Sequence, residues 1–253
     1  MLIEKKNVEL EYISTGIPGL DRLFNNGIPQ GTSILIAGGA GSGKTNLCLQ
    51  ILAYHAKKGA KCYYMGFKEP RKRLIKYMDN FGWNPEKLIE LGNLKIKRFL
   101  TSEIYYYDRK TGGDMQAMMT KDVDPLLMEL EPLAINDDVD FKPDFIVLDS
   151  LTALSSAFRG KEQSYRFYVE KLFRFFEKIG STNFLITETD QSSFISSIGV
   201  EEFLADGVIV LYNDKENDTR KNKIEVLKMR GEKHEKKVFP MEITDKGIKI
   251  ANK

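Results

Sequence analysis

Residues 33–45 have the sequence SILIAGGAGSGKT, and this stretch decides the fold of the chain. Its first part, SILIAG (33–38), is a short apolar run that ends in glycine and predicts a buried strand. Its second part, GGAGSGKT (38–45), has the spacing G-x-x-x-x-G-K-[ST] and leads into a helix predicted over 44–58. A strand, a glycine loop and a helix in this order predict a loop that binds phosphate groups.

The chemistry of this loop follows from its residue types. Glycines let successive backbone N–H groups turn toward one phosphate, and the start of a helix adds partial positive charge. We expect Lys44 to reach the outer phosphates of ATP and the hydroxyl of Thr45 to hold Mg²⁺. A glycine-rich turn before a helix is the alternative, and Lys-Thr in register argues against it. The residues expected to bind the nucleotide here are Gly38, Gly41, Ser42, Gly43, Lys44, Thr45 and Asn46.

A second part of the nucleotide site is predicted where another buried strand ends. The strand DFIVLD (144–149) finishes at Asp149, whose carboxylate would hold the water shell of Mg²⁺ beside Thr45. Taken alone, Asp149 fits the N-cap of a helix equally well. The glycine loop in the same chain favours the metal role.

The remaining elements alternate between strand and helix, which predicts a parallel sheet covered on both faces. A helix that Asp124 and Pro125 start is expected to be broken by Pro132 and the acidic stretch NDDVD (136–140). One apolar helix face is expected from Tyr168, Leu172, Phe175 and Ile179. The fold class is therefore α/β: a P-loop core with a mostly parallel central sheet, flanking helices and C-terminal antiparallel strands, in one domain over 1–253. Further strands are predicted at 61–67, 94–99, 183–188, 208–212, 224–230, 237–243 and 247–251, and further helices at 71–81 and 161–179.

Composition limits the class of protein. The 253 residues are 29% charged and 42% apolar, with a net charge of +2, which is typical of a soluble globular chain. This balance neither requires nor excludes nucleic acid. With only Cys48 and Cys62, no disulfide framework is expected, and the start of the chain has no apolar run typical of a signal peptide. We therefore expect a cytoplasmic protein without a membrane span.

Segments outside the loop carry a family resemblance. The chain resembles the KaiC-like ATPases, the single- and double-domain relatives of the cyanobacterial clock ATPase within the RecA superfamily. The resemblance covers most of the chain and is weak over 100–143, a segment that we expect to be variable. The matching stretches are STGIPGLDRLFNNGIPQG (14–31), FGW (81–83), DSLTAL (149–154), GVEEFLADGVIVL (199–211), LKMRGEKH (227–234) and MEITDKGIKI (241–250).

The resemblance implies a ring of six identical subunits with ATP between neighbours. It implies that Lys228, Met229 and Arg230 reach the nucleotide of the next subunit, where Arg230 would act in catalysis by stabilising charge on the terminal phosphate. Thr244, Asp245 and His234 match positions that touch the ribose or base across the same interface. Without the resemblance, Lys228 and Arg230 are better explained as solvated charges on an edge strand.

The stretch FKEP (67–70) departs from the family pattern. The resemblance places two adjacent glutamates at positions 68 and 69, one of which polarises the attacking water, and here the first is Lys68. An ammonium cannot take a proton from water at pH 7, although it can bind phosphate. Glu69 is therefore predicted as the catalytic residue that orients the attacking water, and Glu188 is the next candidate for the base. A surface pair beside a helix start remains the alternative.

The sequence thus predicts an ATP-binding ring ATPase with slow Mg²⁺-dependent hydrolysis and a regulatory or signalling role. One alternative is a recombinase paralogue that binds single-stranded DNA through the loop 189–199. That loop has one aromatic residue, Phe194, and no basic residue, whereas single-strand grooves combine stacking rings with cations. Nucleic acid is therefore not the favoured partner. The other alternative is a scaffold that assembles on ATP without hydrolysing it, an interpretation that Lys68 supports.

Overall fold

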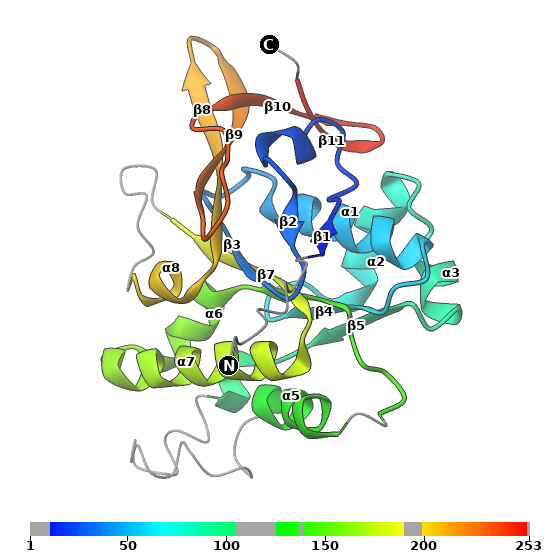
Figure 1. Cartoon of the computed structure of the whole chain (residues 1–253), viewed down its shortest axis with the longest axis vertical. Coiled ribbons are helices and arrows are strands. Elements are labelled where there is room, and N and C mark those ends of the chain that lie inside the picture. The colour runs from blue at the N-terminus through cyan, green and yellow to red at the C-terminus, as the bar shows by residue number, and fades with distance from the viewer. Residues whose placement is uncertain (1–10, 105–124, 137–138, 190–198, 252–253) are drawn as a thin grey trace, which may run out of the picture.

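A nine-stranded sheet forms the centre of the molecule in the computed structural model, which describes residues 11–104, 125–136, 139–189 and 199–251 (Figure 1). Its strand order is β11-β10-β9-β8-β3-β7-β6-β4-β5. The strands are β3 (Ser33–Gly38), β4 (Cys62–Gly66), β5 (Leu94–Arg98), β6 (Phe145–Asp149), β7 (Thr182–Glu188), β8 (Gly207–Glu216), β9 (Thr219–Met229), β10 (Phe239–Thr244) and β11 (Gly247–Ile250). A separate antiparallel pair joins β1 (Tyr12–Ile13) and β2 (Ile28–Pro29).

The sheet has a parallel part and an antiparallel part. Strands β8, β3, β7, β6, β4 and β5 all pair in parallel, and β9, β10 and β11 then add as antiparallel strands after β8. The predicted α/β fold class, with its parallel core and C-terminal antiparallel strands, is confirmed.

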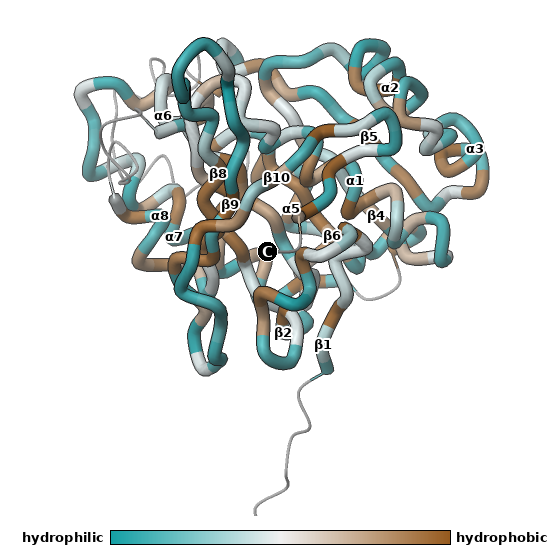
Figure 2. Tube along the Cα trace, turned by 90° about the horizontal axis from the view of Figure 1, so that it is seen from above, coloured by the Kyte–Doolittle hydropathy of each residue, from teal (hydrophilic) through white to brown (hydrophobic). Residues whose placement is uncertain are grey.

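Helices cover both faces of this sheet and create two cores (Figure 1). On one face α1 (Lys44–Lys57), α2 (Arg71–Asn80) and α3 (Pro85–Glu90) pack on alternate strand residues such as Ile36 and Tyr64. On the other face lie α5 (Pro125–Ile135), α6 (Leu151–Ser155), α7 (Glu162–Ile179) and α8 (Val200–Leu204), packed on residues such as Leu35 and Tyr63. Apolar segments run through the central strands in Figure 2, as expected for a sheet buried on both faces.

Strand order brings distant residues to one edge of the sheet. Because β7 lies between β3 and β6, Glu188 pairs with Gly38 and Ile186 pairs with Asp149. On the far side of β6, Asp149 pairs with Gly66 at the end of β4. The carboxyl ends of β3, β7, β6 and β4 therefore meet, which is where ligands bind in open α/β sheets.

The end of β9 lies at the opposite edge. Met229, its last residue, pairs with Gly207, the first residue of β8, and Gly207 in turn pairs with Ile34 near the start of β3. Residues 228–230 thus lie at the amino ends of the parallel strands. We call the two sides of the sheet the carboxyl edge and the amino edge.

Two local predictions need refinement. α5 continues through Pro132 and ends at Ile135, directly before the acidic stretch 136–140, because Leu130 and Leu133 are buried against the second core. On α7 the predicted Phe175 packs against the same core but is half-buried, whereas Phe176 beside it is fully buried. The short elements η1 (Asp21–Leu23), η4 (Ser156–Phe158), α3, α6 and α8 were not predicted, because each is too short for a periodic pattern.

Among the described residues, no helix combines the length and apolar character that crossing a bilayer requires. The basic residues and carboxylates of α2 and α7 interrupt any such run.

The central strands should dominate stability, and a matched pair of leucine variants tests this. Leu185→Ala on β7 removes a fully buried side chain and should lower the free energy of unfolding by about 2–5 kcal/mol. Leu227→Ala on β9 makes the same chemical change at a side chain that is 50% exposed, and should cost less than about 0.5 kcal/mol. Denaturant unfolding of both variants is the measurement, and equal losses would contradict the buried position of β7.

Candidate functional site

The glycine loop between β3 and α1 requires glycine at defined positions. A Cβ at Gly38 would lie 2.3 Å from the carbonyl oxygen of Leu211, so no larger residue fits beside β8. Gly43 has a φ of 98° and directly precedes α1, a conformation that favours glycine. The loop can therefore turn its backbone tightly into the helix, as the sequence predicted.

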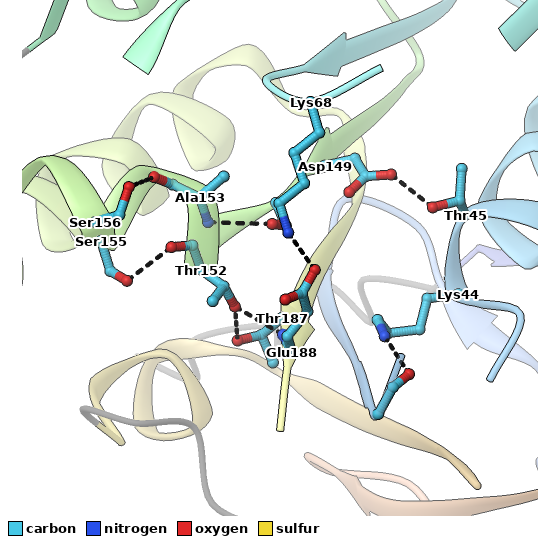
Figure 3. A network of polar contacts seen from close by, with 12 residues as sticks. Lys44, Thr45, Lys68, Asp149, Thr152, Ala153, Ser155, Ser156, Thr187 and Glu188 are labelled. Carbon is cyan, nitrogen blue, oxygen red and sulfur yellow. Dashed lines mark hydrogen bonds and ion pairs between the residues drawn. The ribbon is translucent and has the colours of Figure 1, made fainter. Parts of the chain in front are cut away.

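Lys44 is buried inside this loop. Its ammonium group donates to the carbonyl oxygens of Gly38 and Gly39, each at 2.8 Å (Figure 3). Burial lowers the pKa of Lys44, and the nearby carboxylates of Glu188 and Asp149 oppose that shift. Within the part of the chain that the structure describes, its ammonium group is thus held at the loop by two backbone carbonyl groups.

Thr45 and Asp149 meet as predicted, although they come from elements separated by β7. The Thr45 hydroxyl donates to Oδ2 of Asp149 at 2.8 Å, and Tyr64 donates to the same oxygen at 2.6 Å. Burial, followed by the charge of Asp149, raises the pKa of Tyr64 well above its ordinary value, so it stays a hydrogen-bond donor. Tyr64 was missed by the sequence analysis, because only the pairing of β4 with β6 places it beside Asp149.

These groups fit a magnesium ion. A threonine hydroxyl and a carboxylate at hydrogen-bond distance are the oxygen donors that Mg²⁺ uses beside a phosphate loop. In addition, Ser42 is fully buried and its hydroxyl has no hydrogen-bond partner among the described residues. An unsatisfied hydroxyl inside the loop fits a site that binds a further polar group.

The alternative interpretation of Asp149 as a helix cap is not what the structure shows. The Asp149–Ser150 peptide bond is cis, and Ser150 is the residue that caps α6, accepting a hydrogen bond from Ala153 N at 3.2 Å. The carboxylate of Asp149 is left to Thr45 and Tyr64.

Lys68 and Glu188 form an ion pair across the site (Figure 3). Lys68 follows β4 and Glu188 ends β7, so the pair spans the end of β6 and its Asp149. Thr152 on α6 accepts a hydrogen bond from Glu188 N at 2.7 Å and lies 3.2 Å from the hydroxyl of Thr187. Thr152 was not predicted, and its only sequence signal is its position three residues after Asp149.

Glu69 faces a different partner. Its carboxylate accepts from Arg73 Nη1 at 3.0 Å, one turn along the chain at the start of α2. Glu69 and Lys68 are adjacent in sequence, yet their side chains form separate ion pairs. The role of Glu69 in orienting the attacking water stays a prediction.

Lys228, Met229 and Arg230 lie at the amino edge, away from the glycine loop of their own chain. Lys228 donates to the carbonyl oxygens of Glu202 at 2.7 Å and Ala205 at 2.6 Å, and burial lowers its pKa. Arg230 donates to the carbonyl oxygens of Phe203 and Leu204. In this chain both cations therefore hold the end of α8.

The remaining predicted residues fall into two groups. His234 lies in the segment that follows Arg230 and forms an isolated antiparallel β-bridge with Phe24. Thr244 instead ends β10 and Asp245 follows it, on the side of the glycine loop, because Ile243 approaches Gly43. Thr244 donates to the carbonyl oxygen of Gly247 at 2.8 Å across the turn between β10 and β11. Asn46 is half-buried in the first turn of α1.

A comparison with protein families places the chain. The model of the KaiC ATPase family matches residues 13–253, which is nearly the whole chain. The chain belongs to the KaiC family of ATPases. Family membership and the confirmed fold together support an ATP-binding, RecA-like ATPase domain of KaiC type.

Individual relatives agree with this family. The circadian clock protein KaiC3 of Synechocystis is 32% identical over 98% of this chain and 47% of its own length. A UPF0273 protein of Thermotoga maritima is 30% identical over 95% of this chain and 96% of its own length. The crystal structure of the KaiC-like protein PH0186 of Pyrococcus horikoshii superposes with a TM-score of 0.75 at 29% identity, covering 96% of this chain and all of that one. This chain spans about half the length of the curated clock proteins it matches and nearly all of the single-domain relatives.

Lys44 should be required for nucleotide affinity and dispensable for folding. Lys44→Ala removes a charged donor whose partners are backbone carbonyls, so it should weaken Mg-ATP binding about 10- to 150-fold, equivalent to about 1.5–3 kcal/mol. Titration calorimetry of the variant measures this. Lys57→Ala, at the exposed far end of the same helix, is the control and should bind like the parent. Unchanged affinity in Lys44→Ala would show that this loop does not hold the phosphates.

Proposed function

We propose that the chain is a Mg²⁺-dependent ATPase that hydrolyses ATP slowly, acts as a ring of six identical subunits and serves a regulatory or signalling role. One observation carries this proposal: Lys44, Thr45 and Asp149 converge at the carboxyl edge, whereas Lys228 and Arg230 lie at the amino edge. A complete site would then need the amino edge of a second copy.

The residues at the carboxyl edge have distinct proposed roles. Backbone N–H groups of the loop and the Lys44 ammonium bind the phosphates of ATP. Thr45 and Asp149 would hold Mg²⁺, which supplies charge neutralisation between the two outer phosphates. Tyr64 keeps the Asp149 carboxylate oriented by donating to the oxygen that Thr45 also contacts.

The residues at the amino edge would complete the site of the next subunit. A guanidinium in trans stabilises charge that develops on the terminal phosphate during transfer. Arg230 is 52% exposed at its side chain, which is consistent with access from another copy. We also propose His234, four residues after Arg230, as a contact of the ribose or base. Thr244 and Asp245, at the end of β10 on the side of the loop, are proposed as further contacts of the ribose or base.

Slow turnover follows from the charges beside the loop. Lys68, where the family resemblance implies an acid, pairs with Glu188, and Glu69 pairs with Arg73. Glu188 and Glu69 are thus each engaged by a cation, and one of these ion pairs must open before its carboxylate can orient water. Glu69 is the residue proposed from sequence for that role.

A second candidate function is an ATP-dependent scaffold that does not hydrolyse. The Lys68–Glu188 ion pair favours this function. If the pair stays closed when ATP is bound, the protein binds ATP but Glu188 is not available to activate water. Binding of single-stranded DNA gains no such support: residues 190–198 of the candidate loop lie outside the described residues, and Arg73 of the basic run 70–73 is paired with Glu69. We propose a cytoplasmic location, which the free thiols of Cys48 and Cys62 favour.

Assembly should depend on nucleotide. If ATP lies between subunits, ligand binding stabilises the assembled state by mass action. We expect a hexamer in Mg-ATP at micromolar protein, with a shift toward smaller species when nucleotide is removed. Mass photometry or light scattering with and without Mg-ATP measures this. A monomer under both conditions would contradict the ring and leave Lys228 and Arg230 as internal contacts of α8.

Complementation between two inactive variants tests whether the site is shared. Lys44→Ala and Arg230→Ala should each lose ATP turnover, because one lacks the loop cation and the other lacks the cation in trans. Mixed and allowed to exchange subunits, they should regain part of the parental turnover, since some interfaces then combine an intact loop with an intact Arg230.

The control for that experiment is Arg166→Ala, which removes an exposed arginine that pairs with Glu170 on α7. It should keep parental turnover alone and add nothing beyond dilution when mixed with Lys44→Ala. A mixture of Lys44→Ala and Arg230→Ala that stays inactive, although native mass spectrometry shows mixed rings, would contradict a shared site.

A further inference from the structure

The ion pair between Lys68 and Glu188 joins two strand ends that are not neighbours in the sheet. β4 and β7 lie on opposite sides of β6, so the two side chains reach over Asp149 to meet (Figure 3). The pair therefore spans the end of β6, on the same side of the sheet as Asp149, the acid that contacts Thr45.

The backbone around Glu188 is fixed close to the loop. Glu188 pairs with Gly38 in the sheet, and Thr189 N donates to the carbonyl oxygen of Gly38 at 3.2 Å. The same carbonyl accepts from Lys44 Nζ at 2.8 Å. Thr152 holds Glu188 N from the other side at 2.7 Å. Backbone hydrogen bonds thus fix Glu188 on both sides, close to Lys44, the residue expected to contact the outer phosphates.

The pair itself is only half-buried. The side chains of Lys68 and Glu188 are 49% and 44% exposed, and ion pairs this exposed contribute little to stability. A terminal phosphate carries more charge than a carboxylate and offers several oxygens, so it is the stronger partner for an ammonium. Burial lowers the pKa of Lys44, the charges of Glu188 and Asp149 raise it and the charge of Lys68 lowers it further, so Lys68 and Glu188 act electrostatically on the cation of the loop.

We propose that the Lys68–Glu188 pair is a latch that ATP opens: the terminal phosphate takes over the Lys68 ammonium, and the released Glu188 carboxylate becomes the general base that activates the attacking water. This inference rests on the proposed function and specifies how that site is controlled. ADP, which lacks the terminal phosphate, leaves the latch closed.

The chemical step balances with these groups. The oxygen of water forms a bond to the terminal phosphorus, and the bond from that phosphorus to the bridging oxygen breaks with its electron pair remaining on ADP. Glu188 accepts one proton from the water and then passes it to the released phosphate, so the carboxylate is regenerated. Lys68 stays protonated throughout and neutralises charge on the phosphate oxygens.

Glu69 is the competing residue, and its geometry differs. Its carboxylate is held by Arg73 from the same helix start, a contact that no nucleotide group need disturb. Glu188 instead has as its partner Lys68, a cation that ATP itself can draw away. If Glu188 activates the water, Glu188→Gln should lower ATP turnover and Glu69→Gln should not. If Glu69 activates the water, the reverse is expected.

The experiment compares Glu188→Gln with Glu69→Gln, and Lys68→Met with the parent. Glu188→Gln should lower the single-turnover rate about 10²–10⁴-fold, the range of a positioned acid or base, while Mg-ATP affinity stays within about threefold. Lys68→Met should weaken ATP about tenfold and leave ADP affinity unchanged, because only ATP supplies the group that Lys68 would bind. The ratio of ATP to ADP affinity is a readout that a merely structural ion pair would not change.

A matched control uses the exposed pair Lys221–Glu216 on the β8–β9 hairpin. Glu216→Gln and Lys221→Met make the same chemical changes at similar exposure and should leave rate and affinity ratio at parental values. The latch is overturned, with the proposed function intact, if Glu188→Gln keeps the parental rate while Glu69→Gln loses it, or if Lys68→Met weakens ATP and ADP equally. A parent that binds no Mg-ATP overturns both the latch and the proposed function.

Discussion

The hydrogen bond between Thr45 and Asp149 is the contact on which the rest of the site depends. It joins the first turn of α1, which follows β3, to the end of β6, although β7 lies between β3 and β6 in the sheet. It can form only if all three strands run in parallel and end at one level, as their register shows. Parallel strands need long crossovers, and the helices that supply them bury both faces of the sheet. The parallel architecture of the domain therefore also determines where the oxygen atoms of Thr45 and Asp149 lie.

The same constraint separates the functional residues into two sets. Strands that run in parallel send their ends to the carboxyl edge, and the antiparallel return of β9 sends Lys228 and Arg230 to the amino edge. Their distance from the loop is therefore a result of topology, not of a local conformation that could relax. In a single chain these cations find carbonyl groups of α8. A role toward phosphate requires another copy of the chain.

Much of this could be predicted from the sequence, because the decisive signals are local. Strand, glycine loop and helix follow one another in 33–57, and Asp149 ends a continuous apolar run. Strand order is not local, so the sequence offered no way to see that Tyr64 reaches Asp149 or that Lys68 meets Glu188. The pair of Glu69 with Arg73 is different: its spacing of four residues at a helix start could have been recognised. Short elements such as α3 escaped because six residues show no periodicity, and α5 passed Pro132 because burial of Leu130 and Leu133 outweighs one lost hydrogen bond.

The contacts of Lys228 and Arg230 also bear on α8, a helix of five residues. A helix this short does not hold itself together in water, because too few turns follow its nucleation. The carbonyl groups at its end accept from the ammonium of Lys228 on β9 and the guanidinium of Arg230 just after β9, so these side chains act as a C-cap supplied by another element. The helical conformation of α8 therefore depends on the hydrogen bonds from Lys228 and Arg230 to its end. An anion that binds Lys228 and Arg230 in place of these carbonyl groups removes the cap, and α8 should then fray. In the proposed ring, fraying of α8 in one subunit would follow from phosphate binding in its neighbour.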